Sequence, residues 1–481
     1  MKRFSLILLI TTMILTHAVP IYAEEVVSTE EPSTSNSETP SSSSESLQTT
    51  ESESAQTSSQ ETSQPSSSEA PPSSSSETPQ TTDEKTPQNE QKSFDAPAKH
   101  AIVIDSETGQ ILYEKAAKTP VEIASITKIL TVYLTYQAID SGMITLDTKV
   151  KISNYPYRLT SNPEIRNIPL ETRNYTVEHL LYATLVSSSN SAAIALAEKV
   201  AGTEPLFVNK MRDQLKQWGI TDATIVNASG LNNTTLGDNR YPGSAEDDEN
   251  KLSARDVAII AQHLITDFPQ VLDITSTPYY SLDNNTYTTS NQLLDGMNMS
   301  RANVSGLKTG TTDKSGDCFV ATSTENNIPV ISVVLDADNA ENDHMARFTA
   351  TNALLDHIET TYERRVILKK DESLPKSYVS IKDGVAGTIQ AIAQKDLTYD
   401  YQVDNYDQPD LSSHFKTDMR HAVAPIKKGE DAGQFIITAD NSHYITGKPA
   451  FVPAIFKEST EKVPFYQVWW NRFVEFVNDK L

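Results

Sequence analysis

The stretch from Val121 to Gly142, VEIASITKILTVYLTYQAIDSG, constrains the fold of this 481-residue chain more than any other. The helix that it predicts carries apolar residues on all sides, and such a helix belongs inside a domain core. Ser125 and Lys128 stand three residues apart at its start, and side chains at this spacing share a helix face. The sequence therefore predicts a serine and a lysine within mutual reach at the end of a buried helix.

This pair is suited to nucleophilic catalysis. A serine hydroxyl attacks a carbonyl group only when a base takes its proton, and a lysine can be that base if burial or a neighbouring cation lowers its pKa. The apolar helix supplies burial, and its dipole favours negative charge developing near Ser125. Taken alone, the pair also fits a helix-capping serine followed by a solvated lysine. The choice between these two interpretations therefore depends on other motifs in the chain.

The N-terminal part predicts export and disorder. Residues 1–23 have the basic start and apolar run of a signal peptide. Residues 24–94 are mostly Ser, Thr, Glu, Gln and Pro, with 14 acidic residues and two lysines, and cannot bury enough apolar surface to order. We interpret them as a disordered spacer; a dedicated binding role stays open. The single cysteine, Cys318, excludes an internal disulfide and is expected to be a small buried residue.

The remaining chain reads as two folded parts, a catalytic domain at 95–362 and a β-rich domain at 363–460. In the first part, periodicity and turn residues predict a hairpin at 101–114, helices at 176–185, 191–202, 203–218, 253–266 and 346–361, and strands near 279–289, 318–323 and 329–335. Ser153 to Arg173, with three prolines, is expected to be irregular, and Asn232 to Lys251 a long polar loop. After Arg364, short strands are expected at turn spacing, at 378–381, 388–393, 397–403, 422–426 and 434–439.

Three short motifs occur in order along the first part. They are Ser125-Ile126-Thr127-Lys128 at a helix start, Ser188-Ser189-Asn190 at a helix junction, and Lys308-Thr309-Gly310 beside a strand. This set is typical of penicillin-binding proteins and class A β-lactamases. With the flanking residues SNSAAIALAE, NASGLNN and GLKTGTT, the chain from about Ala96 onwards resembles the low-molecular-weight penicillin-binding proteins, serine-type D-alanyl-D-alanine carboxypeptidases of Gram-positive type. It departs from the common pattern at Ser191, where an aspartate often stands.

The resemblance implies an α+β fold: an antiparallel sheet with helices on both faces plus an all-helical lobe, followed by a small β-rich domain. It implies an enzyme that removes the terminal D-alanine from peptidoglycan stem pentapeptides through an acyl-enzyme and that β-lactams inhibit covalently. No cofactor or metal is expected, since His179, His263 and His344 lack ligand spacing. The formal net charge of −24 argues against nucleic acid as a partner.

The family pattern assigns catalytic roles to four residues. Ser125 is expected to be the nucleophile and Lys128 its base, kept neutral at working pH. Ser188 is expected to relay a proton to the leaving amine. Asn190 is expected to orient the substrate amide.

The third motif is expected to bind substrate through Lys308, Thr309, Gly310 and Thr311. Lys308 adds positive potential, which lowers the pKa of Lys128 and attracts the terminal carboxylate of D-Ala-D-Ala, and Thr309 can hydrogen-bond that carboxylate. By resemblance, the backbone N–H groups of Ser125 and Thr311 form the oxyanion hole.

Two alternative functions stay open at this point. A class A β-lactamase would share the three motifs, but no E-x-x-L-N follows between the second and third. A non-enzymatic surface adhesin on a Ser/Thr-rich stalk would explain the N-terminal segment alone. Leu374 to Ser377, LPKS, is not a sorting motif for such a protein.

The C-terminal residues 463–481 predict a helix with many aromatic residues and one narrow polar stripe. Its internal charges make it a poor membrane span, whereas it suits a helix lying among lipid headgroups. We predict a membrane-associating helix; the alternative is a helix packed on the β-rich domain. The expected location is the outer face of the cytoplasmic membrane, or the cell wall, of a Gram-positive bacterium.

Overall fold

The computed structural model describes residues 94–403, 411–439 and 444–478. The predicted signal peptide, and the predicted disordered segment except Phe94, lie outside these residues. Phe94 packs on the fold, because its ring stacks on that of His357 with the centroids 4.3 Å apart. Phe94, the last residue of the segment predicted to be disordered, is therefore packed against the folded part.

A five-stranded antiparallel sheet forms the centre of the first part, in the order β2-β1-β11-β10-β9. Its strands are β1 Ala98–Asp105, β2 Ile111–Lys115, β9 Gly306–Thr312, β10 Gly316–Glu325 and β11 Ile328–Ala337. The predicted hairpin is confirmed as β1 and β2. The third motif lies in β9 itself, at the open edge of the sheet, where Lys308 pairs with Val320 of β10.

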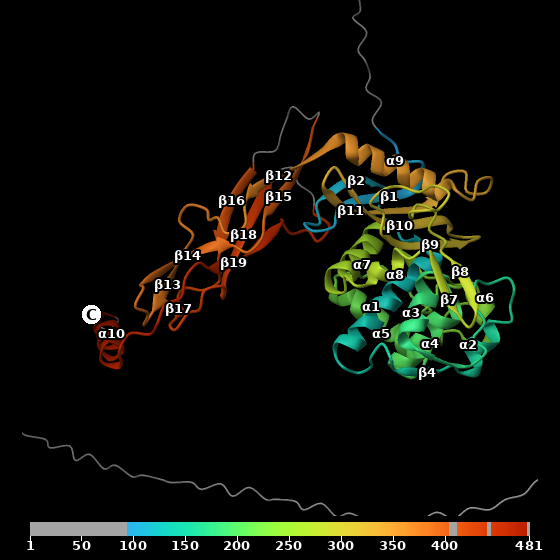
Figure 1. Cartoon of the computed structure of the whole chain (residues 1–481), viewed down its shortest axis with the longest axis horizontal. Coiled ribbons are helices and arrows are strands. Elements are labelled where there is room, and N and C mark those ends of the chain that lie inside the picture. The colour runs from blue at the N-terminus through green and yellow to red at the C-terminus, as the bar shows by residue number, and fades with distance from the viewer. Residues whose placement is uncertain (1–93, 404–410, 440–443, 479–481) are drawn as a thin grey trace, which may run out of the picture. The chain divides into compact units, whose positions relative to one another are not determined.

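Helices cover both faces of this sheet (Figure 1). In β1, Ala101 and Val103 face α9 (Ala346–Thr361), while Ile102 and Ile104 face the helical lobe, as the two-residue period of a strand requires. On that second face, α7 (Ala254–Asp267) packs against β1 and β11. The α+β architecture expected from the resemblance is confirmed.

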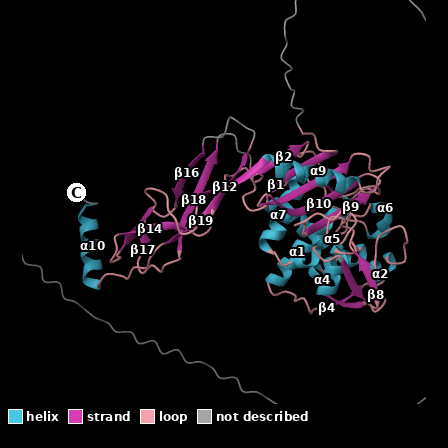
Figure 2. Cartoon of the chain, turned by 45° about the horizontal axis from the view of Figure 1, so that its top comes forward, coloured by secondary structure: helices cyan, strands magenta, loops and turns pink. Residues whose placement is uncertain are grey.

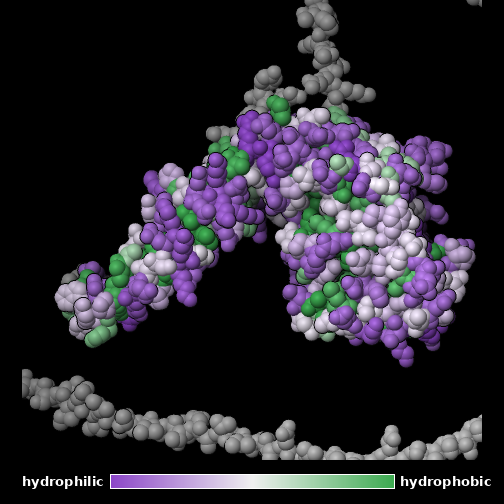
Figure 3. All heavy atoms as spheres, viewed as in Figure 1, coloured by the Kyte–Doolittle hydropathy of each residue, from purple (hydrophilic) through white to green (hydrophobic). Residues whose placement is uncertain are grey.

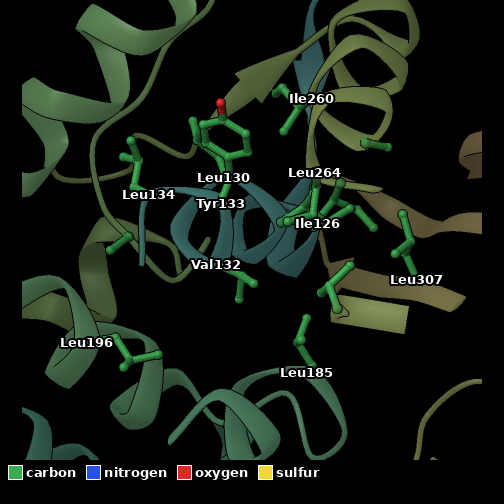
Figure 4. Packing of buried hydrophobic residues seen from close by; sticks show 14 of the residues in the cluster. Ile126, Leu130, Val132, Tyr133, Leu134, Leu185, Leu196, Ile260, Leu264 and Leu307 are labelled. Atoms are coloured by element: carbon green, nitrogen blue, oxygen red, sulfur yellow. The ribbon is translucent and has the colours of Figure 1, made fainter. Parts of the chain in front are cut away.

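The helical lobe surrounds α1 (Lys128–Asp140). Ten of the 13 residues of α1 are buried, so the prediction of a core helix is confirmed. Figure 4 shows side chains of α1 among those of α3 (Val177–Leu185), α4 (Asn190–Ala201) and α7. The labelled neighbours from these three helices are Leu185, Leu196, Ile260 and Leu264. Another helix, α5 (Glu204–Gln217), also packs against α1 and α4.

Capping residues place the helix starts where the sequence predicts them. Thr176 accepts a hydrogen bond from the His179 amide at the start of α3, and Ser253 forms a capping box with Asp256 at the start of α7. Gly202 ends α4 at a φ of 84°, a conformation that a glycine adopts without strain. These local signals are independent of tertiary packing, which is why the sequence reveals them.

The two segments expected to be irregular each contain a short helix. α2 (Asn154–Leu159) begins within the first, and Pro156 stands in its first turn, where a missing N–H group breaks no helical hydrogen bond. α6 (Asn233–Leu236) lies in the polar stretch, with Asn232 as its cap. The prolines and polar residues therefore did not exclude helices, and the expectation of continuous loops was wrong.

Several short helices and strands lie between the elements described above. α8 spans Val271–Thr275. Three two-stranded pairings consist of β3 Val121–Glu122 with β6 Lys251–Leu252, β4 Lys149–Lys151 with β5 Asn174–Thr176, and β7 Tyr279–Leu282 with β8 Asn285–Thr288.

Between α9 and α10 (Phe465–Asn478), the described residues form strands (Figure 2). β12 Tyr362–Leu368 pairs with β15 Leu397–Gln402. A six-stranded sheet has the order β16-β18-β19-β14-β13-β17, with β13 Tyr378–Lys382, β14 Thr388–Ala393, β16 Leu411–Lys416, β17 Ala422–Val423, β18 Asp431–Ala439 and β19 Phe451–Phe456. β17 is shorter than the predicted 422–426, because Pro425 has no N–H group to continue the ladder. β12, β16 and β19 were not predicted.

Arg364 connects the β1–β2 hairpin to the β12–β15 pair. Its guanidinium donates to Asp105 Oδ2 (2.6 Å), Asp400 Oδ1 (2.9 Å) and Glu107 Oε2 (2.8 Å). Gln110 Nε2 also donates to the Asp400 carbonyl at 2.7 Å. Asp105 and Asp400 are buried, and buried carboxylates require such a partner.

Candidate active site

Ser125 and Lys128 lie on either side of a change of helix type. Ser125 is in a 3-10 turn, η1 (Ala124–Thr127), and Lys128 is the first residue of α1. The α-helix therefore starts later than the sequence indicates. The two side chains still meet, with Lys128 Nζ 2.9 Å from Ser125 Oγ. Lys128 is fully buried, so its amine is held in the protein interior.

The amine of Lys128 has three neighbours. Besides Ser125 Oγ, they are Asn190 Oδ1 at 2.7 Å and the Ser229 carbonyl oxygen at 2.6 Å. A neutral amine has two N–H groups and one lone pair. The two acceptor oxygens match the N–H groups, so the lone pair is left to face the Ser125 hydroxyl.

Electrostatics favour the neutral form. Burial, and then the charges of Lys308 and Arg166, hold the pKa of Lys128 well below its usual range. An uncharged lysine in contact with a serine hydroxyl is able to take its proton.

The second motif is held in an uncommon backbone conformation. Ser188 has a φ of 57°, in the left-handed region that residues other than glycine seldom adopt, and such strain persists where the surroundings enforce it. The next residue, Ser189, caps α4. Asn190 Nδ2 donates to the Arg166 carbonyl at 2.9 Å, which turns its Oδ1 towards Lys128. Ser191 Oγ is buried without a hydrogen-bond partner among the described residues.

The third motif lies against η1. A Cβ atom on Gly310 would lie 2.8 Å from the Ile123 carbonyl oxygen, so a glycine lets β9 approach the serine turn closely. Lys308 Nζ donates to the Thr309 carbonyl at 2.9 Å. Burial, together with the charges of Arg166 and Arg347, lowers the pKa of Lys308 to about 7.

A second glycine supports the serine turn from the NASG segment. Gly230 has a φ of 81°, and a Cβ atom there would lie 1.9 Å from the Ala124 carbonyl oxygen. Ala124 itself has a φ of 46°. Asn227 Oδ1 shapes the turn by accepting from the Gly230 amide at 2.6 Å. The residue before Ser125 is therefore fixed by close backbone packing.

The three motifs open onto one cleft of about 580 Å³. Its lining comes from the helical lobe, from β9 and from the polar stretch around α6. The residues are Ser125, Glu164, Ile165, Arg166, Ser188, Asn190, Gly230, Leu231, Asn232, Thr234, Thr235, Glu249, Thr309, Gly310, Thr311, Thr312, Asp313 and Lys314. The predicted site residues therefore meet in one place, with Lys128 and Lys308 buried behind the cleft wall.

Three residues that contribute to the site were not predicted from the sequence. Arg166 lies in a segment that we expected to be irregular, Ser229 acts through its backbone carbonyl, and Arg347 reaches β9 from α9. Arg347 donates to the Gly310 carbonyl at 2.8 Å and to Thr311 Oγ1 at 2.7 Å. A backbone contact has no residue-type signal, and a lone arginine in a helix does not reveal its target.

Among the described residues, neither Cys318 nor any histidine lines the cleft. Cys318 is buried in β10, and burial raises the pKa of its thiol to about 12. No group of three or more His, Cys, Asp or Glu side chains in the described ranges is placed to hold a metal ion.

Comparison with known proteins identifies the family. Residues 84–339, more than half of the chain, match the family model described as D-alanyl-D-alanine carboxypeptidase. The chain belongs to this family. This chain is 27% identical over 375 residues to D-alanyl-D-alanine carboxypeptidase DacF of Bacillus subtilis, and the match covers 76% of this chain and 87% of the relative. It is also 29% identical over 398 residues to D-alanyl-D-alanine carboxypeptidase DacC of Escherichia coli, and this match covers 79% of this chain and 89% of the relative.

Solved structures of similar proteins are consistent with this family assignment. A structure described as a peptidoglycan synthesis regulatory factor (PBP3) from Streptococcus pneumoniae is 49% identical, with a TM-score of 0.71, over 76% of this chain and 100% of that one. Penicillin binding protein 5 from Haemophilus influenzae, at 24% identity and a TM-score of 0.57, shares the fold, over 76% of this chain and 98% of that one. The protein is therefore a serine-type D-Ala-D-Ala carboxypeptidase, and the family match favours this activity over a β-lactamase or an adhesin.

Replacing Gly230 by alanine should displace the serine turn. The new Cβ atom would meet the Ala124 carbonyl, and a shift of about 1 Å in reacting groups can cost about 100-fold in rate. We expect Gly230→Ala to slow acylation by a fluorescent penicillin by about this factor. Gly243→Ala is the control: Gly243 also has a positive φ, 84°, but nothing lies within 4 Å of its Cβ position. Equal acylation rates in the two variants would show that the contact is unimportant.

Proposed function

We propose that the carboxypeptidase works by acyl transfer, with Ser125 as nucleophile and Lys128 as general base. One observation supports this most directly: the buried amine of Lys128 lies 2.9 Å from Ser125 Oγ, and its other two neighbours are acceptors. A base needs such contact with the proton that it removes. No cofactor enters the proposal.

In the first step, Ser125 Oγ attacks the carbonyl carbon between the last two D-alanines, and its proton passes to Lys128 Nζ. The tetrahedral intermediate then loses the C–N bond. The leaving amine takes a proton from Lys128 through the Ser188 hydroxyl. Free D-alanine departs, and the shortened peptide stays bound to Ser125 as an ester.

In the second step, water replaces the leaving D-alanine. Lys128, again neutral, removes one proton from the water as its oxygen attacks the ester carbonyl. The C–O bond to Ser125 breaks, and the serine oxygen takes the proton back from Lys128. The enzyme is regenerated with a peptide one D-alanine shorter.

We assign substrate binding to the edge strand β9. Thr309 and the positive potential of Lys308 attract the terminal carboxylate of the substrate, while Asn190 orients its amide. Gly310 leaves space for β9 to lie beside Ser125. The backbone N–H groups of Ser125 and Thr311 would stabilise the oxyanion, an interaction worth about 3 kcal/mol per donor.

The proposed substrate is the peptidoglycan stem pentapeptide ending in D-Ala-D-Ala. β-Lactam antibiotics present a reactive amide to the same serine and form a slowly hydrolysed ester. The proposed domains are a catalytic domain at 95–362 and a β-rich domain at 363–460. Each contains a buried apolar cluster, and Ile445 of the β-rich part joins the cluster of the catalytic part. Residues 1–23 would direct export, and residues 24–94 would act as a spacer.

We also propose that α10 lies on the membrane of a Gram-positive bacterium. On the face drawn in Figure 3, the surface is mostly hydrophilic and its apolar residues form small patches. α10 instead exposes seven large hydrophobic side chains: Phe465, Tyr466, Trp469, Trp470, Phe473, Val474 and Phe476. None of the described helices is long and apolar enough to cross a membrane. Exposed aromatic residues on a short helix favour the lipid interface.

The alternative position for α10, packed on the β-rich part, has limited support. Val468 is the buried residue of the helix. Lys382 of β13 donates to Glu475 at 2.8 Å, but Glu475 is exposed and Lys382 is partly exposed, and ion pairs that solvent reaches contribute little. These contacts leave the aromatic surface free for lipid.

Substituting the nucleophile tests the function. Ser125→Ala should abolish labelling by fluorescent penicillin and release of D-alanine, because no other hydroxyl contacts Lys128 Nζ among the described residues. The exposed Ser141→Ala, at the other end of α1, should label like the parent protein. Circular dichroism would verify that both variants fold. Covalent label on the alanine variant would remove Ser125 as nucleophile.

The rate of acylation should depend on pH through Lys128. Its folded-state pKa is lowered, so the neutral base is present above that pKa and is lost as pH falls through it. Acylation should therefore decline on the acid side, as followed by the second-order rate of penicillin labelling between pH 4 and 8. Lys128→Arg, which stays charged, should be inactive, whereas the exposed Lys199→Arg on α4 should react normally. A flat profile, or an active Lys128→Arg, would contradict a neutral-lysine base.

Removing Pro464 to Leu481 should yield an active enzyme that no longer binds membranes. Flotation with anionic phospholipid vesicles would measure binding of the full chain and of the truncated form. Lys382→Ala, which breaks the ion pair to α10 without removing aromatic residues, should still float with the vesicles. If the truncated enzyme stays on cell membranes, the anchoring role moves from α10 to an uncleaved 1–23 segment.

A further inference from the structure

A buried carboxyl group that takes no part in the proposed proton transfers lies behind Lys128. It belongs to Glu204, the first residue of α5. Among the described residues, no basic side chain forms an ion pair with it, and its two oxygens accept from neutral donors. The Ala228 N–H group donates to Oε1 and the Tyr155 hydroxyl donates to Oε2, both at 2.9 Å. Glutamate is seldom buried without a charged partner, so the groups that it binds indicate its role.

The amide that Glu204 binds is the middle one of a buried turn at 226–230. Asn250 Oδ1 accepts from the first two amides of this turn, at 2.6 and 3.2 Å. Asn227 Oδ1 accepts from the last two, at 3.2 and 2.6 Å. The amide between these pairs, that of Ala228, is left to Glu204. Ala228 is fully buried, and a buried N–H group without an acceptor is costly, so the middle of the turn depends on this carboxyl group.

The two carbonyl groups that follow this amide both contact α1. The Ala228 carbonyl accepts from Thr131 Oγ1 at 2.6 Å. The Ser229 carbonyl, one residue further on, accepts from Lys128 Nζ at 2.6 Å. Ala228 is therefore bound by Glu204 on one side and by α1 on the other, and this fixes the peptide that leads to the contact with Lys128.

We propose that Glu204 is a positioning residue that holds the Ser229 carbonyl against Lys128 Nζ. It acts through the Ala228 amide, and the inference rests on the proposed function of Lys128 as base. With the carbonyl in place, both N–H groups of the neutral amine are bound and its lone pair is directed to the Ser125 hydroxyl. If the carbonyl withdraws, the amine can rotate and the lone pair is no longer held at the proton that it removes.

The hydrogen bond to Ala228 does not require a charge on Glu204. Burial raises the pKa of Glu204 to about 7, and the hydrogen bonds from Ala228 and Tyr155 oppose this rise. The titratable groups that face it are Tyr155 of α2 and Glu198 of α4. An amide N–H can only donate, so Oε1 stays an acceptor in both states, and a proton on Oε2 can be donated to the Tyr155 oxygen. A glutamine with its nitrogen towards Tyr155 reproduces this pattern.

The experiment compares a variant that removes the acceptor with one that keeps it. Glu204→Met has a similar length but no acceptor for the Ala228 amide. It should lower kcat for release of D-alanine from an N-acylated tripeptide ending in D-Ala-D-Ala by about 10- to 100-fold, the cost of displacing reacting groups by up to about 1 Å. KM should stay nearly unchanged, because Ala228 and Ser229 are fully buried and neither lines the cleft.

Two further variants are the controls. Glu204→Gln keeps the acceptor and should retain most of the parent kcat. The exposed Thr203→Ala removes the cap of the same helix but leaves the acceptor of the Ala228 amide in place, so it should also turn over like the parent enzyme.

The pH profile separates positioning from a loss of stability. A carbonyl oxygen binds an ammonium group more strongly than a neutral amine, so the Ser229 carbonyl favours the charged form of Lys128. Losing this contact in Glu204→Met should lower the pKa of Lys128 further, and the acid side of the penicillin-labelling profile should move to lower pH. In Glu204→Gln it should stay in place. Partial unfolding would reduce the number of sites labelled at completion, but it would change neither the rate per site nor the profile.

The outcomes distinguish the two claims. A parent enzyme that neither releases D-alanine nor takes up fluorescent penicillin would overturn the proposed function. With an active parent, a Glu204→Met variant with the parent kcat per labelled site and an unmoved acid side would overturn the positioning role alone, as would a Glu204→Gln variant as slow as Glu204→Met. If Glu204→Met does not fold, Glu204→Asp withdraws the carboxyl group by one methylene and should be slower than Glu204→Gln. Equal rates in these two variants would count against the proposal.

Discussion

The burial of one amine, that of Lys128, is the constraint on which the site depends. An ammonium group in the interior is costly unless it is paired with an anion, and the described neighbours of Lys128 Nζ are a hydroxyl, an amide oxygen and a carbonyl oxygen. The cost favours the neutral amine, which is the form that can remove a proton. The apolar helix α1 is thus part of the chemistry, because its packing keeps water away from this nitrogen.

Each partner of Lys128 comes from a different element, and the fold has to bring them together. Ser125 comes from η1, Asn190 from the start of α4, and the Ser229 carbonyl from the NASG turn. The edge strand β9 then closes the site from the sheet side. Gly230 and Gly310 allow this assembly, since a side chain at either position would collide with the backbone before Ser125. Close backbone packing positions the nucleophile.

Positive charge is distributed unequally around the cleft. Arg347 and Asp317 form a buried pair behind β9, and Arg364 joins two buried carboxylates between β1 and β15. These pairs hold strands together. Arg166 lines the cleft, and its side-chain hydrogen-bond partner among the described residues is the neutral hydroxyl of Ser290.

The sequence by itself determined the local features: the core helix, the caps Thr176 and Ser253, the β1–β2 hairpin and the three motifs. These depend on neighbours a few residues away, so residue type and spacing suffice. Tertiary structure alone decided the short helices α2 and α6, the order of the strands, and the roles of Arg166, Ser229 and Arg347. The contacts of these three residues join parts far apart in the chain, and Ser229 acts through its backbone carbonyl, which leaves no signal in residue type.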